Sequence, residues 1–167
     1  VWAGFDDRRL IELINVASVL FAESGVRLAV KETIALDCPE WEDIEPDDLP
    51  AIRAASRDPV TTIYLVQTAA YGVAYIGGLS YPKPTNCILI AYRSCSDVLA
   101  HEIAHSFGLP HVEGSPCNVM RGSACCGGGH FNAEQGIVLR SGANPKALIA
   151  SRVNLDESPF VCETSNE

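Results

Sequence analysis

The sequence predicts a single α/β domain in which helices alternate with the strands of one twisted, mixed sheet. The apolar residues change their period along the chain, from about 3.6 in helix-like stretches to two in strand-like ones. With 167 residues, of which 47% are hydrophobic and 20% are charged, the chain can bury a core of its own. We therefore expect one domain over residues 1–167, with an upper part over about 1–108 and a smaller, loop-rich C-terminal part over about 109–167.

The first half of the chain supplies a helix and most of the strands. Residues 6–24 have apolar side chains at helical spacing before Gly25, which predicts an amphipathic helix. Residues 26–31 alternate with period two and predict a half-buried strand that 33–36 can extend, whereas the acidic stretch 37–48 predicts a solvated loop. Beyond this loop we expect a short helix over 49–57 and strands over 61–68, 72–79 and 87–92.

The second half combines two helices with a loop-rich segment. Cap-type residues at 94–97 open a helix that continues to Phe107 and is stopped by Gly108. Residues 108–131 contain six glycines and few periodic apolar positions, so we expect loops there. Asn132 and Gln135 form the pattern of a capping box for a helix through about Arg140, and a short helical stretch and an extended end follow from Pro145.

The charge balance excludes two classes of partner. Twelve basic against 21 acidic residues give a net charge of −9, which is the wrong sign for binding nucleic acid or an anionic membrane surface. No apolar run reaches the roughly 18 residues of a membrane span. Residues 1–4 are neither basic nor a hydrophobic run, so we expect that an export signal has already been removed.

The seven cysteines indicate disulfides and an oxidising compartment. They are spread from Cys38 to Cys162 without a CxxC pair, which argues against a zinc ribbon or a thioredoxin-type motif. We expect at least two disulfides, and the odd number leaves one thiol over; the sequence leaves the pairing open. A calcium ion in the acidic stretch 37–48 is possible but unsupported, because its oxygen ligands have no regular spacing.

One group of residues, within 101–111, has the spacing of a metal-binding site. His101 and His105 lie four residues apart inside a predicted helix and therefore share a face, where both rings can bind one ion. Gly108 ends that helix, and a reversal there can bring His111 to the same ion. Three neutral imidazoles and one water are the open coordination of a catalytic zinc, and Glu102 is placed to reach the water rather than the metal.

The run HEIAHSFGLPH, residues 101–111, resembles the HExxHxxGxxH signature of the metzincin zinc endopeptidases. The resemblance implies a zincin-like fold with an active-site helix, and it implies that Met120, the only methionine, forms the turn beneath the metal. It covers about residues 6–142 in element order and is strongest over 72–122.

The run GVAYIGGL, residues 72–79, is similar to the antiparallel edge strand of these enzymes, most of all in the reprolysin (adamalysin) form. An exposed edge can bind an extended peptide as one more strand. The similarity implies substrate-binding roles for six residues: Gly72, Val73, Ala74, Tyr75, Ile76 and Gly77.

Departures from the family patterns leave the subfamily open. Val112 follows the third histidine, where reprolysins usually have Asp, astacins Glu and matrix metalloproteinases Ser. Arg121 and Gly122 replace the Met-x-Tyr pattern of astacins and serralysins, so no tyrosine is placed as an extra ligand. We expect His130, which lies in a glycine-rich run, to be a surface or loop-packing residue.

These features together predict a secreted zinc endopeptidase, matured by removal of a signal and a pro-segment. We expect one catalytic Zn²⁺, Glu102 as general base, a monomer, and a polypeptide substrate bound as an extended strand. Residues 112–124 should wall the pocket for the side chain after the scissile bond. Two alternatives stay open: a catalytically silent, zinc-stabilised binding module, and a zinc hydrolase of a non-peptide amide.

Overall fold

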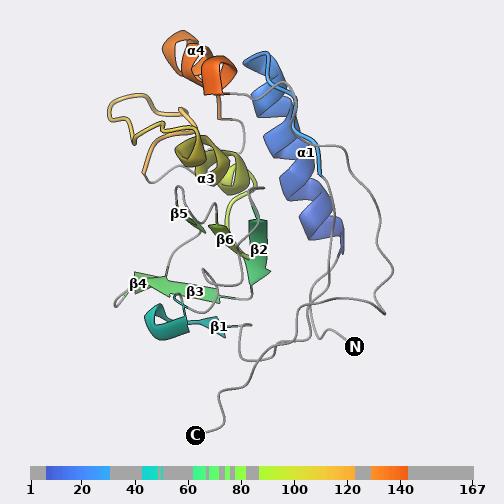
Figure 1. Cartoon of the computed structure of the whole chain (residues 1–167), viewed down its shortest axis with the longest axis vertical. Coiled ribbons are helices and arrows are strands. Elements are labelled where there is room, and N and C mark those ends of the chain that lie inside the picture. Colours follow the sequence, from blue (N-terminus) through green and yellow to red (C-terminus); the bar gives the residue numbers. More distant parts are fainter. Residues whose placement is uncertain are drawn as a thin grey trace, which may run out of the picture.

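The computed structural model of the chain describes residues 7–30, 43–48, 50, 62–66, 68–71, 74–75, 78–81, 87–122 and 129–142. Helices and short strands are mixed along this part of the chain, as predicted (Figure 1). Helix α3 (Val98–Ser106) packs on strands β5 (Gly78–Tyr81) and β6 (Cys87–Ala91), and helix α1 (Asp7–Glu23) packs against α3. No helix among the described residues is long and apolar enough to span a membrane.

Helix α1 forms where the apolar residues repeat with helical period, and its bounds confirm the predicted helix. Its buried face consists of Leu13, Ala17, Leu20 and Phe21. The helix ends in a left-handed residue, Gly25, with a φ of 76°. The N–H groups of Gly25 and Val26 donate to the carbonyl oxygens of Ala22 and Phe21, both at 2.9 Å, so two carbonyls of the last turn are satisfied.

Strand β6 is the centre of the sheet that supports the site. All five of its residues are buried, as expected for an apolar strand covered on both faces. Strand β2 (Thr62–Val66) pairs with it in parallel, with Thr62 opposite Cys87. Strand β5 pairs with its other side in antiparallel register, with Gly78 opposite Ile90. The sheet is therefore mixed and has an antiparallel strand at one edge of the described part, as predicted.

The period-two stretch from Val26 is not a strand over residues 26–30, so that prediction is wrong for the described part. Val26 is buried and Arg27 is exposed, as alternation requires. A strand also needs a neighbour with which to exchange hydrogen bonds, and no described strand pairs with this segment. Residues 31–36 lie outside the described residues.

The predicted strands over 61–68 and 72–79 are wrong in extent, because the chain changes sheet within each of them. Strand β2 belongs to the sheet of β6, whereas β3 (Thr68–Tyr71) pairs with β4 (Ala74–Tyr75) in a second sheet. The predicted burial of 61–68 is also wrong for β2, where only Val66 is buried and Ile63 is 40% exposed. Among the described strands, β2 pairs with β6 alone.

The acidic stretch is not entirely a loop. Strand β1 (Asp43–Ile44) pairs in parallel with β3, and the short 3-10 helix η2 (Pro46–Asp48) follows it. Ile44 is 1% exposed, and this apolar residue accounts for the departure from a solvated loop. Residues 37–42, the predicted helix 49–57 except Pro50, and the tail from 143 lie outside the described residues.

Helix α4 (Ala133–Gly142) begins with the predicted capping box. The Gln135 N–H donates to Asn132 Oδ1 at 2.9 Å, and the Asn132 N–H donates to Gln135 Oε1 at 2.8 Å. At its other end, Arg140 Nη1 donates to the Ser24 carbonyl at 2.8 Å, so α4 is joined to the end of α1. Leu139 of α4 lies in the same buried core as Phe21 of α1. The division into upper and lower parts stays a prediction.

Candidate metal centre

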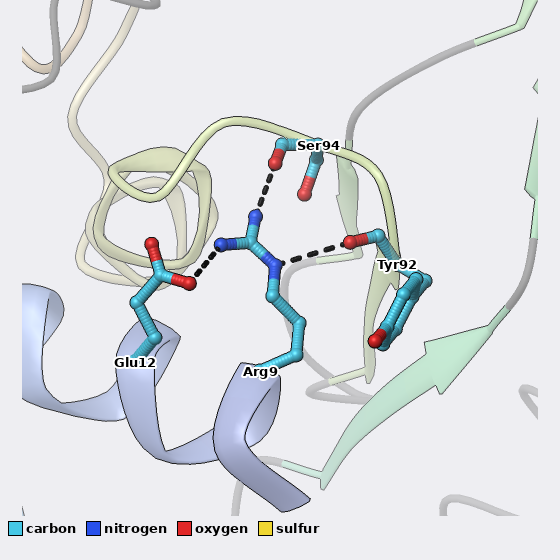
Figure 2. Close-up of polar contacts among 4 residues, drawn as sticks. All are labelled: Arg9, Glu12, Tyr92 and Ser94. Carbon is cyan, nitrogen blue, oxygen red and sulfur yellow. Dashed lines mark hydrogen bonds and ion pairs between the residues drawn. The ribbon is translucent and has the colours of Figure 1, made fainter. Parts of the chain in front are cut away.

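The loop between β6 and α3 sets where the active-site helix begins. Figure 2 shows Arg9 of α1 between Glu12 and the main chain of this loop. Arg9 Nε donates to the Tyr92 carbonyl at 3.1 Å, and Nη2 donates to the Ser94 carbonyl. Arg9 Nη1 also pairs with Glu12 at 2.7 Å. The first residues before α3 are therefore tied to α1 by a charge-assisted contact.

Helix α3 has the bounds that the sequence predicts, and it places His101 and His105 on one face. It is capped by Phe107, and Gly108 follows with a φ of 89°, in the left-handed region that favours glycine. A Cβ on Gly108 would meet nothing within 4 Å, so the backbone conformation is the reason for glycine there. The chain reverses after it and brings His111 back to the helix.

The three predicted ligands meet at one point. Nε2 of His105 lies 3.0 Å from Nε2 of His101, and Nε2 of His111 lies 3.1 Å from each of the other two. In the described part of the chain, these three residues are the group of histidine, cysteine and acidic side chains that could hold a metal ion. His130 is exposed and does not belong to this group.

The hydrogen bonds of the two helix histidines fix which nitrogen carries the proton. His101 Nδ1 lies 2.6 Å from the Val119 carbonyl, and His105 Nδ1 lies 2.7 Å from the Leu109 carbonyl. A carbonyl oxygen only accepts, so each Nδ1 must donate. In a neutral ring, Nε2 then presents a lone pair toward the other imidazoles.

Burial favours the neutral form of these two rings. Desolvation lowers the pKa of His101, and the neighbouring His105 and His111 lower it further, against the raising effects of the Val119 carbonyl and Asp97. Desolvation also lowers the pKa of His105, with the Leu109 carbonyl acting in the opposite direction. Lone pairs that face each other at about 3 Å need a cation between them, and neutral imidazole is a preferred ligand of Zn²⁺. The donor set therefore fits one zinc ion.

The segment after His111 supports the histidines through its main chain. Met120 is fully buried, and its carbonyl accepts from the Val112 N–H at 2.9 Å, next to His111. The preceding carbonyl, that of Val119, is the partner of His101. Met120 is thus in the core, with a main-chain bond to the residue after His111, and its role as the floor under the rings stays a prediction.

Glu102 lies against the edge strand. It is 5% exposed, and a Cβ on Gly78 would come within 2.7 Å of its Cγ and 3.0 Å of its Oε1. Gly78 has no side chain, and this absence leaves room for the Glu102 carboxylate between α3 and β5. Gly78 was not predicted as a site residue; the doublet Gly77-Gly78, at the start of β5, was the available signal.

Of the six residues predicted to bind substrate, the structure describes two, and it places these two in a sheet other than the one next to the site. Ala74 and Tyr75 lie in β4, which pairs with β3, and the other four lie outside the described residues. The described edge strand that adjoins Glu102 is β5. The predicted substrate roles of residues 72–77 stay predictions.

Comparison with known proteins agrees with this geometry. A family model described as metallopeptidase family M12B, reprolysin-like, matches residues 8–112, which is more than half of the 167-residue chain. Searches of curated proteins and of solved structures found no match. The matched segment runs from α1 through the third histidine, and the chain therefore belongs to the reprolysin-like metallopeptidases of family M12B.

Proposed function

We propose that this zinc metallopeptidase is an endopeptidase that cleaves internal bonds of an extended polypeptide, with Glu102 as general base. The observation that supports the proposal is the buried position of the Glu102 side chain next to the metal ligands. Its carboxylate is buried on the helix of two zinc ligands and lies against Gly78, at the start of the edge strand. A site that held zinc only for stability would not need this carboxylate.

Each residue then has a defined task. His101, His105 and His111 would hold the zinc, which when bound supplies Lewis acidity for a carbonyl oxygen and acidifies a water molecule. The Glu102 carboxylate accepts a proton from the attacking water and passes it to the nitrogen of the leaving amine. The burial of Glu102 limits competing water and strengthens its interaction with the reacting groups.

The edge strand supports the choice of an extended peptide as substrate. In the described sheet order β2–β6–β5, strand β5 pairs with β6 on one side only. A peptide added along its other side would exchange main-chain hydrogen bonds with β5 and pass next to Glu102. We further propose that residues 112–124 wall the pocket for the side chain after the scissile bond.

An extracellular site of action and a monomeric state are part of the proposal. Cys95 takes part in a disulfide, which supports an oxidising compartment. Maturation by removal of a signal and a pro-segment agrees with this setting. Mass spectrometry of peptides from the denatured, unreduced protein tests it: seven alkylated thiols would contradict it.

Digestion of a peptide library, with sequencing of the products, tests the endopeptidase activity. We expect cleavage within peptides, and Glu102→Gln should lower kcat by about 10²–10⁴-fold while one zinc per chain is retained. Glu23→Gln, an exposed carboxylate at the end of α1, is the matched control and should act like the wild type. Zinc binding without cleavage would favour a silent binding module, and cleavage of non-peptide amides alone would favour the other hydrolase.

A further inference from the structure

A buried pair of amide side chains joins the segment around Met120 to helix α4. Asn118 is 1% exposed and Gln135 is 5% exposed. Asn118 Nδ2 donates to Gln135 Oε1 at 2.8 Å, and Gln135 Nε2 donates to Asn118 Oδ1 at 3.1 Å. The two side chains thus satisfy each other's donor and acceptor in the core.

Each amide oxygen has a second partner, and this fixes the orientation of both groups. Asn118 Oδ1 accepts the Met120 N–H at 2.8 Å, and Gln135 Oε1 accepts the Asn132 N–H at 2.8 Å. An amide rotated by half a turn would place its NH₂ group against these N–H donors. The geometry of the turn from Asn118 to Arg121 is therefore set by a side chain on another element.

One carbonyl of this turn contacts a metal ligand, and a second accepts from the residue that follows another ligand. The Val119 carbonyl, one residue after Asn118, lies 2.6 Å from His101 Nδ1. The Met120 carbonyl accepts from the Val112 N–H, next to His111. Two of the three zinc ligands are thereby linked to a turn whose shape depends on the Asn118–Gln135 pair.

We propose that Asn118 and Gln135 are positioning residues of the metal centre, which orient the His101 ring through the Val119 carbonyl. Partners of this kind keep the tautomer and direction of a ligating imidazole. Helix α4 is then a working part of the zinc site, although residues 113–142 lie beyond the segment that matches the family. The proposal rests on the zinc site and is independent of the substrate that the enzyme cleaves.

The test compares two variants of α4 that differ in their contact with the turn. Gln135→Leu removes the hydrogen bonds of the amide, whereas Leu139→Ala removes buried volume from the same helix and leaves the pair intact. Zinc affinity is measured on the full chain by competition with a chromophoric chelator, at a temperature where circular dichroism shows each variant folded. We expect Gln135→Leu to weaken zinc binding by about 10–100-fold. Leu139→Ala should lower Tm but leave zinc affinity within about twofold.

A second substitution at Gln135 and a measurement of the His101 tautomer make the outcome unambiguous. Gln135→Met has an unbranched chain that follows the path of glutamine, so it gives the same comparison if leucine prevents folding. In the zinc-free protein, ¹⁵N NMR of the imidazoles should show His101 protonated at Nδ1 in the wild type and a mixture of tautomers in Gln135→Leu. Wild-type zinc affinity in Gln135→Leu or Gln135→Met, or an equal loss in Leu139→Ala, would overturn the proposal. Because no peptide is cleaved in this test, its failure is distinct from failure of the endopeptidase assignment.

Discussion

The metal centre is built from two regions that position their histidines in different ways. In the helix region, α3 places His101, Glu102 and His105 by its regular period, and its buried face secures them. In the turn region, residues 108–122 and α4 place His111 and the supporting carbonyls by single hydrogen bonds and two left-handed glycines, Gly108 and Gly114. The helix region therefore supplies the chemistry, while the turn region supplies the shape on which that chemistry depends.

The largest effect on stability is expected at Met120, where two substitutions distinguish a packing role from metal ligation. Met120→Ala should lower the free energy of unfolding by about 2–5 kcal/mol through the cavity left in the core. Met120→Leu conserves volume, should cost less than about 1.5 kcal/mol, and should keep zinc and most activity. Urea denaturation and zinc analysis of both variants check this. If Met120→Leu lost zinc as completely as Met120→Ala, the Met120 sulfur would be a zinc ligand and not a packing group.

A smaller effect is expected at the boundary between the helix region and the edge strand. Gly78→Ala places a methyl group against Glu102 and should lower kcat by about 10–100-fold, because a displacement near 1 Å is costly in a catalytic site. KM and zinc content should change little. Gly136→Ala on α4, whose Cβ would lie 3.2 Å from Arg140 Nη1 and at least 3.7 Å from Ser24, adds a methyl group away from Glu102 and is the control.

Introducing Gly78→Ala into the Glu102→Gln protein sharpens this test. If Gly78 acts through Glu102, then Gly78→Ala should have no further effect on the residual activity of Glu102→Gln. A further tenfold loss in the double variant would show that Gly78 serves another purpose.

The pH dependence of the stability of the zinc-free protein tests the burial of the two histidines in the helix region. Burial lowers the pKa of His101 and His105, while the unfolded rings titrate near 6.5. Below about pH 6.5 the unfolded chain therefore binds more protons than the folded one, and the stability of the folded state falls as the pH drops. Tm measured in chelator between about pH 5 and 8 should show this slope. The double variant His101→Gln/His105→Gln should flatten it, and equal slopes would contradict the assignment.

The smallest effects are expected where α1 supports the start of α3. Arg9→Met removes the donors to the Tyr92 and Ser94 carbonyls and should cost about 1–3 kcal/mol, because hydrogen bonds from a charged group are lost. Glu12→Gln disrupts only the ion pair with Arg9, and Glu12 is 52% exposed, so its effect should stay below about 1 kcal/mol. Thermal unfolding of the two variants side by side distinguishes the contacts, and equal shifts would make the ion pair the stabilising one.

Local patterns predicted much of the fold and all three metal ligands. The cap of α4 and the end of α1 depend on residues a few positions apart, so sequence spacing was sufficient for them. Sheet membership was not readable in this way. The alternation after Gly25 says which side chains can be buried, but it does not say whether another strand offers hydrogen bonds.

The supporting parts of the site were missed for a related reason. Asn118 and Gln135 are 17 residues apart, and the sequence predicted Gln135 as a capping residue but not its pairing with Asn118. Gly78 matters to the site only because the Glu102 side chain, from helix α3, lies against it. Contacts of this kind arise from the folded arrangement and leave no periodic signal in the chain.

Helix α4 has a consequence for the order in which this enzyme assembles on the ribosome. Gln135 joins α4 to the turn at Asn118, and Arg140 joins it to Ser24, 116 residues earlier. A nascent chain that has emerged only through His111 already holds all three zinc ligands but neither of these ties. The emerging chain must therefore extend past Arg140 before the turn at Asn118 and the end of α1 can both be joined to α4.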